Sequence, residues 1–211
     1  MFARSMMVLA TLAVVAAGSA DAQTRNRVGL AAGVNIARVS GDPVDDLDSK
    51  VGFIGGLFST SDFTPRFSVE SGLYYAQRGA KASEAGITGS IKLDYLEIPV
   101  LAVFRFPGSS NVTPFIGAGG AVAFKVDCGF KVSGGPISVG GGCDAAEDEL
   151  DGRLRGTDFG LVGQAGVDIG DFRIAVRYNH GLSNMLDSEG ILPAIRHRSV
   201  GLLAGYAIRL N

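Results

Sequence analysis

The feature that most restricts the fold is a regular series of extended segments. Side chains of an extended chain point alternately to two faces, and this period-two alternation recurs along the chain. No segment keeps the helical period of 3.6 over a useful length, so we expect an all-β protein. The eight segments predicted as strands lie near residues 27–39, 51–62, 66–80, 89–106, 113–126, 157–169, 171–181 and 196–210.

The connections between these segments alternate strictly in length. Short ones lie around Pro65, between Pro107 and Pro114, and at Gly170-Asp171. The long ones are residues 40–50, 81–88, 128–156 and 182–195. An even number of strands with all long loops at one end predicts an eight-stranded antiparallel up-and-down transmembrane β-barrel, with short periplasmic turns and longer extracellular loops. A β-sandwich or a lipocalin gives no reason for this segregation.

The N-terminal residues have the three parts of a secretory signal peptide. Arg4 precedes an apolar run from Met6 to Ala17, and Ala20-Asp21-Ala22 offers a cleavage site. The apolar run is too short to span a bilayer as a helix. We therefore expect residues 1–22 to be a signal peptide and residues 23–211 to form one barrel domain.

Composition and charge exclude some partners. Without the signal peptide the net charge stays −2, since one base and one acid are removed. There is no Lys/Arg-rich run, so we expect no nucleic-acid partner. Cys128 and Cys143 lie in one glycine-rich segment of an exported chain, which favours a disulfide between them. Two cysteines at this spacing without a histidine make a poor metal site, and we expect no metal and no cofactor.

Phenylalanines cluster at the short-turn end of the predicted strands. In a membrane barrel they would form an aromatic girdle at the interface, whereas in a soluble protein they would cap the bottom of the core. The signal peptide and the loop pattern favour the girdle. Its predicted members are Phe63, Phe67, Phe104, Phe106, Phe115 and Phe172.

The stretch FRIAVRYN, residues 172–179, shows how the faces divide. If its apolar row faces lipid, Arg173 and Arg177 point into the lumen, which in an eight-stranded barrel is filled by side chains. Charges enclosed there must be paired, because an isolated ion out of water costs several kcal/mol. We expect contacts of Glu70 or Glu97 with Arg173 or Arg177 that plug the lumen. The full set predicted to line it with charge is Glu70, Glu97, Arg105, Arg173, Arg177 and Arg209.

Four stretches of the chain resemble a known family. They are FSVESGLYYAQRGAK (67–81), YLEIPVLAVFRF (95–106), TPFIGAGGAVAF (113–124) and GLLAGYAIRL (201–210). They are similar to the PorT-like outer-membrane β-barrel family. The resemblance implies a small barrel related in architecture to the membrane domain of OmpA and to OmpX, located in a bacterial outer membrane, and one namesake of the family participates in protein secretion. The chain departs from many outer-membrane barrels in ending on Leu210-Asn211 and not on an aromatic residue.

The search for chemistry gives one weak candidate. The glycines of GAGGAV lack the third glycine and the following helix of a nucleotide-binding fingerprint. His197 and Ser199 fall on one face of the last strand, and Asp187 or Glu189 could complete a triad like that of lipid A deacylases. Two polar residues lining the lumen are the simpler interpretation.

The expected function is therefore structural or interaction-based, not enzymatic. We expect a monomeric scaffold that presents acidic extracellular loops, around residues 42–48 and 144–151, to outer-membrane lipid, lipopolysaccharide or other envelope and secretion proteins. It would not act as a general porin. A lipid-modifying barrel enzyme using His197 and Ser199, and a soluble periplasmic β-barrel, are the alternatives.

Overall fold

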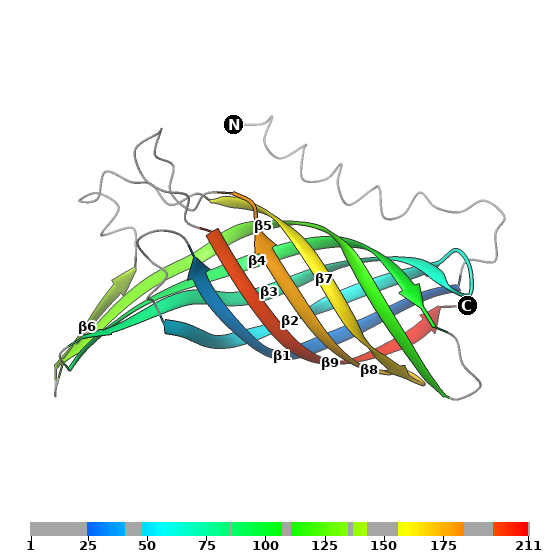
Figure 1. Ribbon diagram of the computed structural model, residues 1–211, viewed down its shortest axis with the longest axis horizontal. Helices are drawn as coiled ribbons and strands as arrows, with labels where there is room; N and C mark the ends of the chain where they lie inside the picture. The colour runs from blue at the N-terminus through cyan, green and yellow to red at the C-terminus, as the bar shows by residue number, and fades with distance from the viewer. Residues whose placement is uncertain are drawn as a thin grey trace.

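The chain folds into a closed antiparallel β-barrel (Figure 1). The computed structural model describes residues 25–40, 48–84, 86–106, 111–134, 137–142, 156–183 and 196–210. The strands within these ranges are β1 (Arg25–Ser40), β2 (Asp48–Asp62), β3 (Phe67–Glu84), β4 (Ile87–Arg105), β5 (Val112–Gly134), β6 (Ile137–Gly142), β7 (Thr157–Ile169), β8 (Phe172–Gly181) and β9 (Arg196–Leu210).

Eight of these strands close the ring. Each pairs with its neighbours in chain order, β5 pairs directly with β7, and β1 pairs with β9. The predicted eight-stranded up-and-down barrel is therefore confirmed. The ninth strand, β6, pairs only with β5 among the described residues and lies outside the ring.

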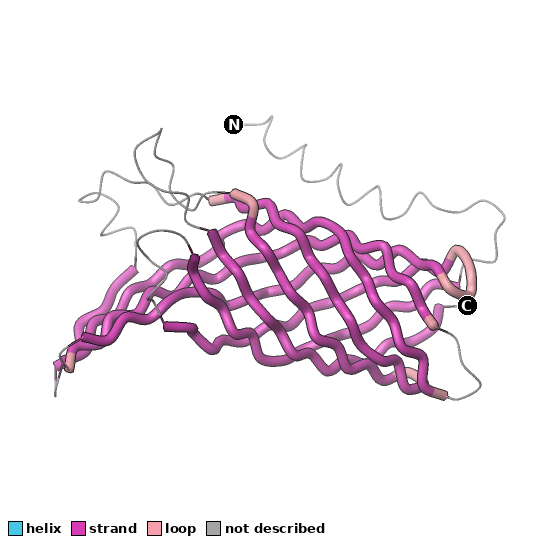
Figure 2. Tube along the Cα trace, in the orientation of Figure 1, coloured by secondary structure: helices cyan, strands magenta, loops and turns pink. Residues whose placement is uncertain are grey.

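The register of the strands sets the tilt and the width of the barrel. A path that follows paired residues once around the barrel begins at Arg25 of β1. It returns to β1 at Asn35, ten residues further along the strand. The path is Arg25, Asp62, Ser68, Val103, Gly117, Gln164, Arg177, Gly201 and Asn35. A stagger of this size over eight strands tilts them by roughly 40° to the barrel axis, and the interior is then just wide enough for side chains to fill. Figure 2 shows the tilt of the strands.

The two faces of the barrel wall have the reverse of the polarity found in soluble proteins. On β8, Phe172, Ile174 and Val176 are exposed, whereas Arg173 and Arg177 are buried. Leu30, Leu57, Ile98, Ile116 and Leu202 are likewise exposed on other strands of the ring. Apolar outward rows around charged inward rows are the pattern of a barrel that meets lipid.

Three strands continue beyond the ring as an open sheet. The parts of β3, β4 and β5 furthest from the short turns, together with β6, form a four-stranded extension at the left of Figure 1. Residues 81–88, predicted as a long loop, are mostly strand, with Gly86 at a positive φ of 82° where the chain reverses. Residues 128–134 and 137–142 of the predicted cysteine loop are also strand. Hydrophobic periodicity missed these segments because Gly, Ser and Lys weaken the apolar alternation there.

The glycines of β5 are explained by close approach of neighbouring backbones. A Cβ atom on Gly119 would lie 2.0 Å from the carbonyl oxygen of Val100 on β4, so any side chain would force the strands apart. Small residues on both faces therefore suit a narrow, curved wall. Gly170 has φ of 61° in the two-residue turn between β7 and β8, a conformation that glycine adopts without strain.

Some predictions concern residues outside the described ranges. The signal peptide (1–22), the acidic residues of 42–47 and 144–151, and Cys143 all lie there, so the Cys128–Cys143 disulfide and the 22/23 boundary stay predictions. Among the described residues, no helix is long and apolar enough to span a bilayer.

Candidate functional site

The lumen of the barrel holds two linked clusters of charged side chains. The first lies towards the short-turn end and centres on Arg173 of β8. Its Nε donates to Asp168 Oδ1 at 2.7 Å, and its Nη1 donates to Glu70 Oε2 at 2.5 Å. Beside it, Arg105 Nη1 lies 2.6 Å from Asp62 Oδ1, and Arg27 lies 3.5 Å from both Asp62 and Asp168. Six strands thus meet through one connected network.

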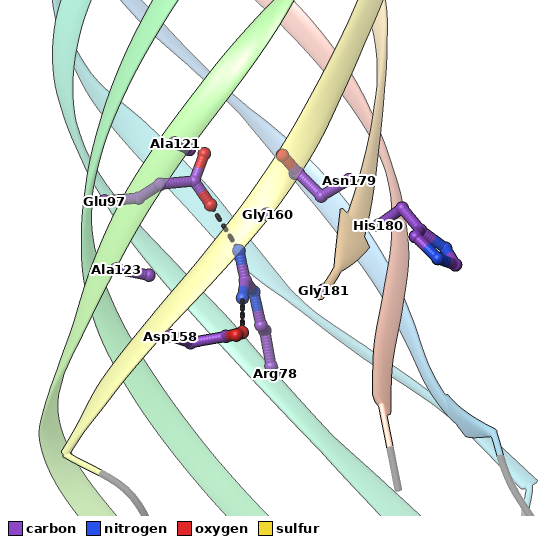
Figure 3. A pocket seen from close by; sticks show the side chains of 9 residues that line it. All are labelled: Arg78, Glu97, Ala121, Ala123, Asp158, Gly160, Asn179, His180 and Gly181. Atoms are coloured by element: carbon purple, nitrogen blue, oxygen red, sulfur yellow. Dashed lines mark hydrogen bonds and ion pairs between the residues drawn. The ribbon is translucent and has the colours of Figure 1, made fainter. Parts of the chain in front are cut away.

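The second cluster lies towards the long-loop end and centres on Glu97 of β4. Glu97 Oε1 accepts a hydrogen bond from Arg177 Nη2 at 2.6 Å, and its other oxygen accepts from Arg78. Arg78 also lies 3.6 Å from Asp158 of β7. Figure 3 shows Arg78 between these two carboxylates. One carboxylate therefore joins guanidinium groups from opposite sides of the barrel.

Charge is balanced across the two clusters. Among the described residues, the lumen ion pairs join five arginines to five carboxylates. The arginines are Arg27, Arg78, Arg105, Arg173 and Arg177, and the carboxylates are Asp62, Glu70, Glu97, Asp158 and Asp168. Equal numbers of positive and negative groups allow every enclosed charge to be paired. This is required in a low-dielectric space, because an unpaired buried charge is strongly destabilising.

Aromatic rings stack on the guanidinium groups. The Cζ atom of Arg173 lies 4.6 Å from the ring centroid of Phe58 and 4.5 Å from that of Phe115. Arg177 lies 4.5 Å over Tyr74, and Arg78 lies 5.0 Å over Tyr95. Cation–π contacts of this kind are stronger when they are removed from water.

The structure places most of the predicted lumen residues together. Arg173 pairs with Glu70 and Arg177 pairs with Glu97, the two contacts expected from sequence, and Arg105 joins the first cluster. Arg209 differs. It continues the inward row of β9 but is exposed, and among the described residues it makes no ion pair. At the rim, the inward side of the strand opens to solvent and gives the guanidinium no enclosed partner.

Five of the six predicted girdle residues face outwards at the short-turn end. Phe63 packs on Phe67 and Phe104 packs on Phe106, while Phe172 packs on Tyr206, which sequence reasoning missed. The assignment of Phe115 to the girdle is wrong. Phe115 is only 1% exposed and stacks on Arg173 inside the lumen, because the neighbouring residue, Ile116, takes the outward position.

The two catalytic candidates both lie inside the lumen. His197 and Ser199 are each 3% exposed. His197 Nε2 is hydrogen-bonded to the hydroxyl of Tyr95 at 3.2 Å, while Ser199 Oγ accepts from Asn179 Nδ2 at 3.5 Å. Among the described residues the two do not bond to each other, as a nucleophile and its base would. Asp187 and Glu189 lie outside the described residues.

Sequence reasoning missed five charged members of the network. They all lie on inward rows and are Arg27, Asp62, Arg78, Asp158 and Asp168. The signal for Arg78 was its phase, since it lies four residues after the inward Tyr74 on the same strand. Asp168 could have been found from the short β7–β8 turn, which places it opposite Arg173. Within the described residues, no group of three or more His, Cys, Asp and Glu side chains could hold a metal ion.

Comparison with known proteins agrees with this architecture. A family model described as "Outer membrane protein beta-barrel domain" matches residues 21–187. No curated protein matches the chain. The solved structures similar to it include the outer membrane protein OprG from Pseudomonas aeruginosa, with 15% identity, 88% of this chain and 97% of that chain covered, and a TM-score of 0.48.

Two further structures are similar over most of their length. Ail, the attachment invasion locus protein of Yersinia pestis, has 18% identity, covers 87% of this chain and 99% of its own, and gives a TM-score of 0.44. The outer membrane enzyme PagL has 15% identity, covers 87% of this chain and 99% of its own, and gives a TM-score of 0.38.

Proposed function

The chain belongs to the outer membrane protein beta-barrel domain family and resides in the bacterial outer membrane, and we propose that it acts there as a closed scaffold for interactions, not as a porin or an enzyme. The observation that carries this proposal is the filled, charge-neutral lumen. Its guanidinium groups are paired with carboxylates and stacked on rings across the full width of the barrel. A solute would have to break several of these contacts at once.

The interaction role rests on the four-stranded extension. Its strands continue past the barrel end that carries the long connections, so they project beyond the lipid on the extracellular side. Exposed apolar side chains there, including Ile137 at 69% and Val139 at 62%, lie outside the lipid-facing wall. Apolar patches in contact with water commonly mark protein contacts. We propose other envelope or secretion proteins as partners, consistent with the PorT-like resemblance. The barrel itself would be a monomer surrounded by lipopolysaccharide.

Conductance measurement tests the closed lumen. Purified protein inserted into planar lipid bilayers is expected to give no stable current steps, since the ion-pair network fills the interior. Electrophoresis of boiled and unboiled samples serves as the folding control, because a folded barrel changes mobility only on heating. Reproducible pore currents from heat-modifiable protein would contradict the proposal.

Site-specific photo-crosslinking in cells tests the interaction role. A photoreactive residue at Val139 on the extension is expected to give adducts with another envelope protein. The matched control is the same residue at Leu202, which is exposed on the lipid-facing wall. Adducts at both positions, or at neither, would argue against a partner-binding extension.

A lipid-modifying enzyme is the second candidate, since His197 and Ser199 share one face of β9 inside the long-loop half of the lumen. We rank it lower because His197 is bonded to Tyr95 and not to Ser199. Replacement of His197 by alanine is expected to leave the lipid A of the cells unchanged. An altered lipid A profile in this variant would favour the enzyme.

A further inference from the structure

The charged side chains of the lumen become less exposed from both ends towards the middle. At the short-turn end, Arg27 and Asp62 are 15% and 21% exposed, and at the long-loop end Asp158 is 11% exposed. Between them, Arg177 and Glu97 are each 1% exposed. The charged groups are therefore most accessible at the two ends of the lumen and most buried at its centre.

The long-loop half of the lumen has buried polar atoms without a protein partner. Within the described residues these include Arg78 Nε, Asp158 Oδ1, Arg177 Nη1, Asn179 Oδ1 and His197 Nδ1. Buried donors and acceptors are almost always satisfied by protein or by ordered water. This half thus offers donors and acceptors together, a mixture that water can satisfy because it both donates and accepts.

A small cavity lies among these atoms. It is lined by Arg78, Glu97, Asp158 and Asn179, with Gly160 and Gly181 in its wall (Figure 3). Its volume of about 10 Å³, measured as room for the centre of a water molecule, suits one ordered water. The side chain of His180 points away from it in Figure 3. The cavity extends to Glu97, the carboxylate that pairs with Arg177.

The layer on the short-turn side of the Glu97–Arg177 pair is packed differently. Arg173 has its Nε, Nη1 and Nη2 all bonded to Asp168 or Glu70, and its guanidinium lies between Phe58 and Phe115. Leu101 and Val103 pack beside Phe115 with at most 1% exposure. Each guanidinium nitrogen of Arg173 therefore has a carboxylate partner.

We infer that the lumen half between Asp158 and Glu97 is a water-binding chamber, closed towards the short-turn end by a dry septum of Phe58, Phe115 and Arg173. The inference rests on the proposed closed scaffold and adds where the barrier lies. It assigns the closure to stacked rings and one guanidinium group. Charge pairing of Glu97 alone does not close the lumen, because water reaches that pair from the chamber.

Magnetic resonance in lipid bilayers tests the chamber. With 15N-labelled arginine, magnetisation transfer from water is expected at Arg78 Nε and is expected to be absent at Arg173 Nε. Single Arg→Lys variants assign the signals. Equal transfer at the two sites would overturn the septum, and absence of transfer at Arg78 would overturn the chamber.

Ring truncation tests the septum by a second readout. The double variant Phe58→Ala/Phe115→Ala is expected to give current steps in planar bilayers, whereas Glu97→Gln is expected to give none. Phe104→Ala removes an outward ring of the same kind and serves as the control. Each variant is first shown to be heat-modifiable, so that misfolding is not read as closure.

The results separate this inference from the proposed function. Pore currents from the wild-type protein would refute the closed scaffold itself. A silent wild type with a silent Phe58→Ala/Phe115→Ala variant, or with currents from Glu97→Gln alone, would refute the septum and leave the closed scaffold standing.

Discussion

The barrel wall and the four-stranded extension are parts of the same strands with opposite surfaces. In the wall, the outward row is apolar and the inward row carries the ion pairs. In the extension, the outward row carries Lys81, Ser90 and Lys131, while Ile91 and Val132 continue the inward row. Strand direction and the order of neighbouring strands do not change between the two regions. What changes is the medium on each side, so the residue pattern records where lipid ends and water begins.

The change from the residue pattern of the wall to that of the extension occurs near Asp94 of β4. The pairing of β4 with β5 shifts by one residue between Asp94 and Tyr95. On the outward side, Asp94 accepts hydrogen bonds from Tyr75 and from Lys92, whose Nζ lies 2.7 Å away. A polar group of this kind fits the interface. On β7, the ten residue steps from Phe159 to Ile169 span ~33 Å of strand. At a tilt of roughly 40° this is ~25 Å along the membrane normal, the height of the apolar band of such barrels.

The largest contrast is expected from removing a buried charge. Arg177→Ala leaves Glu97 with one of its two guanidinium partners lost in the most enclosed part of the lumen, and should lower the free energy of unfolding by about 3–5 kcal/mol. Lys131→Ala, on the exposed outward face of the extension, should change it by less than about 0.5 kcal/mol. Denaturant unfolding in detergent or lipid measures both, and equal effects would mean that the lumen is not enclosed.

A second contrast comes from placing a charge on each apolar surface. Leu202→Arg puts a guanidinium on the lipid-facing wall of β9 and should destabilise the barrel by about 2–4 kcal/mol. Val139→Arg, on the extension, should have little effect because that surface is in water. The same unfolding measurement compares them. A large loss from Val139→Arg would place the extension in lipid and remove the distinction between the regions.

The smallest expected effect concerns pH at the boundary. The hydrogen bond to Asp94 raises the pKa of Lys92 above its ordinary value of 10.5. A raised pKa means that the charged lysine stabilises the fold at all pH values below 10.5, and that this contribution disappears as the pH rises through the folded pKa. The side chain is 41% exposed, so water screens the pair and the effect should be well under 1 kcal/mol.

Unfolding of wild type and Lys92→Met between pH 8 and 12 measures this term. The difference between the two proteins should shrink at the alkaline end. A difference that stays constant over this range would show that the charge of Lys92 does not stabilise the fold.

Much of the lumen could be predicted because alternation fixes which residues share a face. Once the apolar row of FRIAVRYN is placed towards lipid, Arg173 and Arg177 must point inwards, and acids on the inward rows of other strands become their partners. The same rule would have included Arg78 and Asp168. Finding them requires the phase to be followed along every strand.

Phe115 and Arg209 show where reasoning along the chain fails. Phe115 was assigned by its nearness to a turn, and the surrounding glycines and alanines of β5 give no apolar alternation from which its phase can be read. Arg209 has the correct phase, but enclosure depends on its height in the barrel. Height is set by the stagger between strands, which no single strand reveals.

By itself, the sequence determined that this chain forms eight lipid-spanning strands, because period-two alternation and turn residues are local properties. Only the tertiary structure decided how the charges pair, that Phe115 lies against Arg173, and that three strands continue with a fourth beyond the lipid. Those outcomes depend on the ten-residue stagger and on the closure of β1 against β9, which bring together residues more than a hundred positions apart.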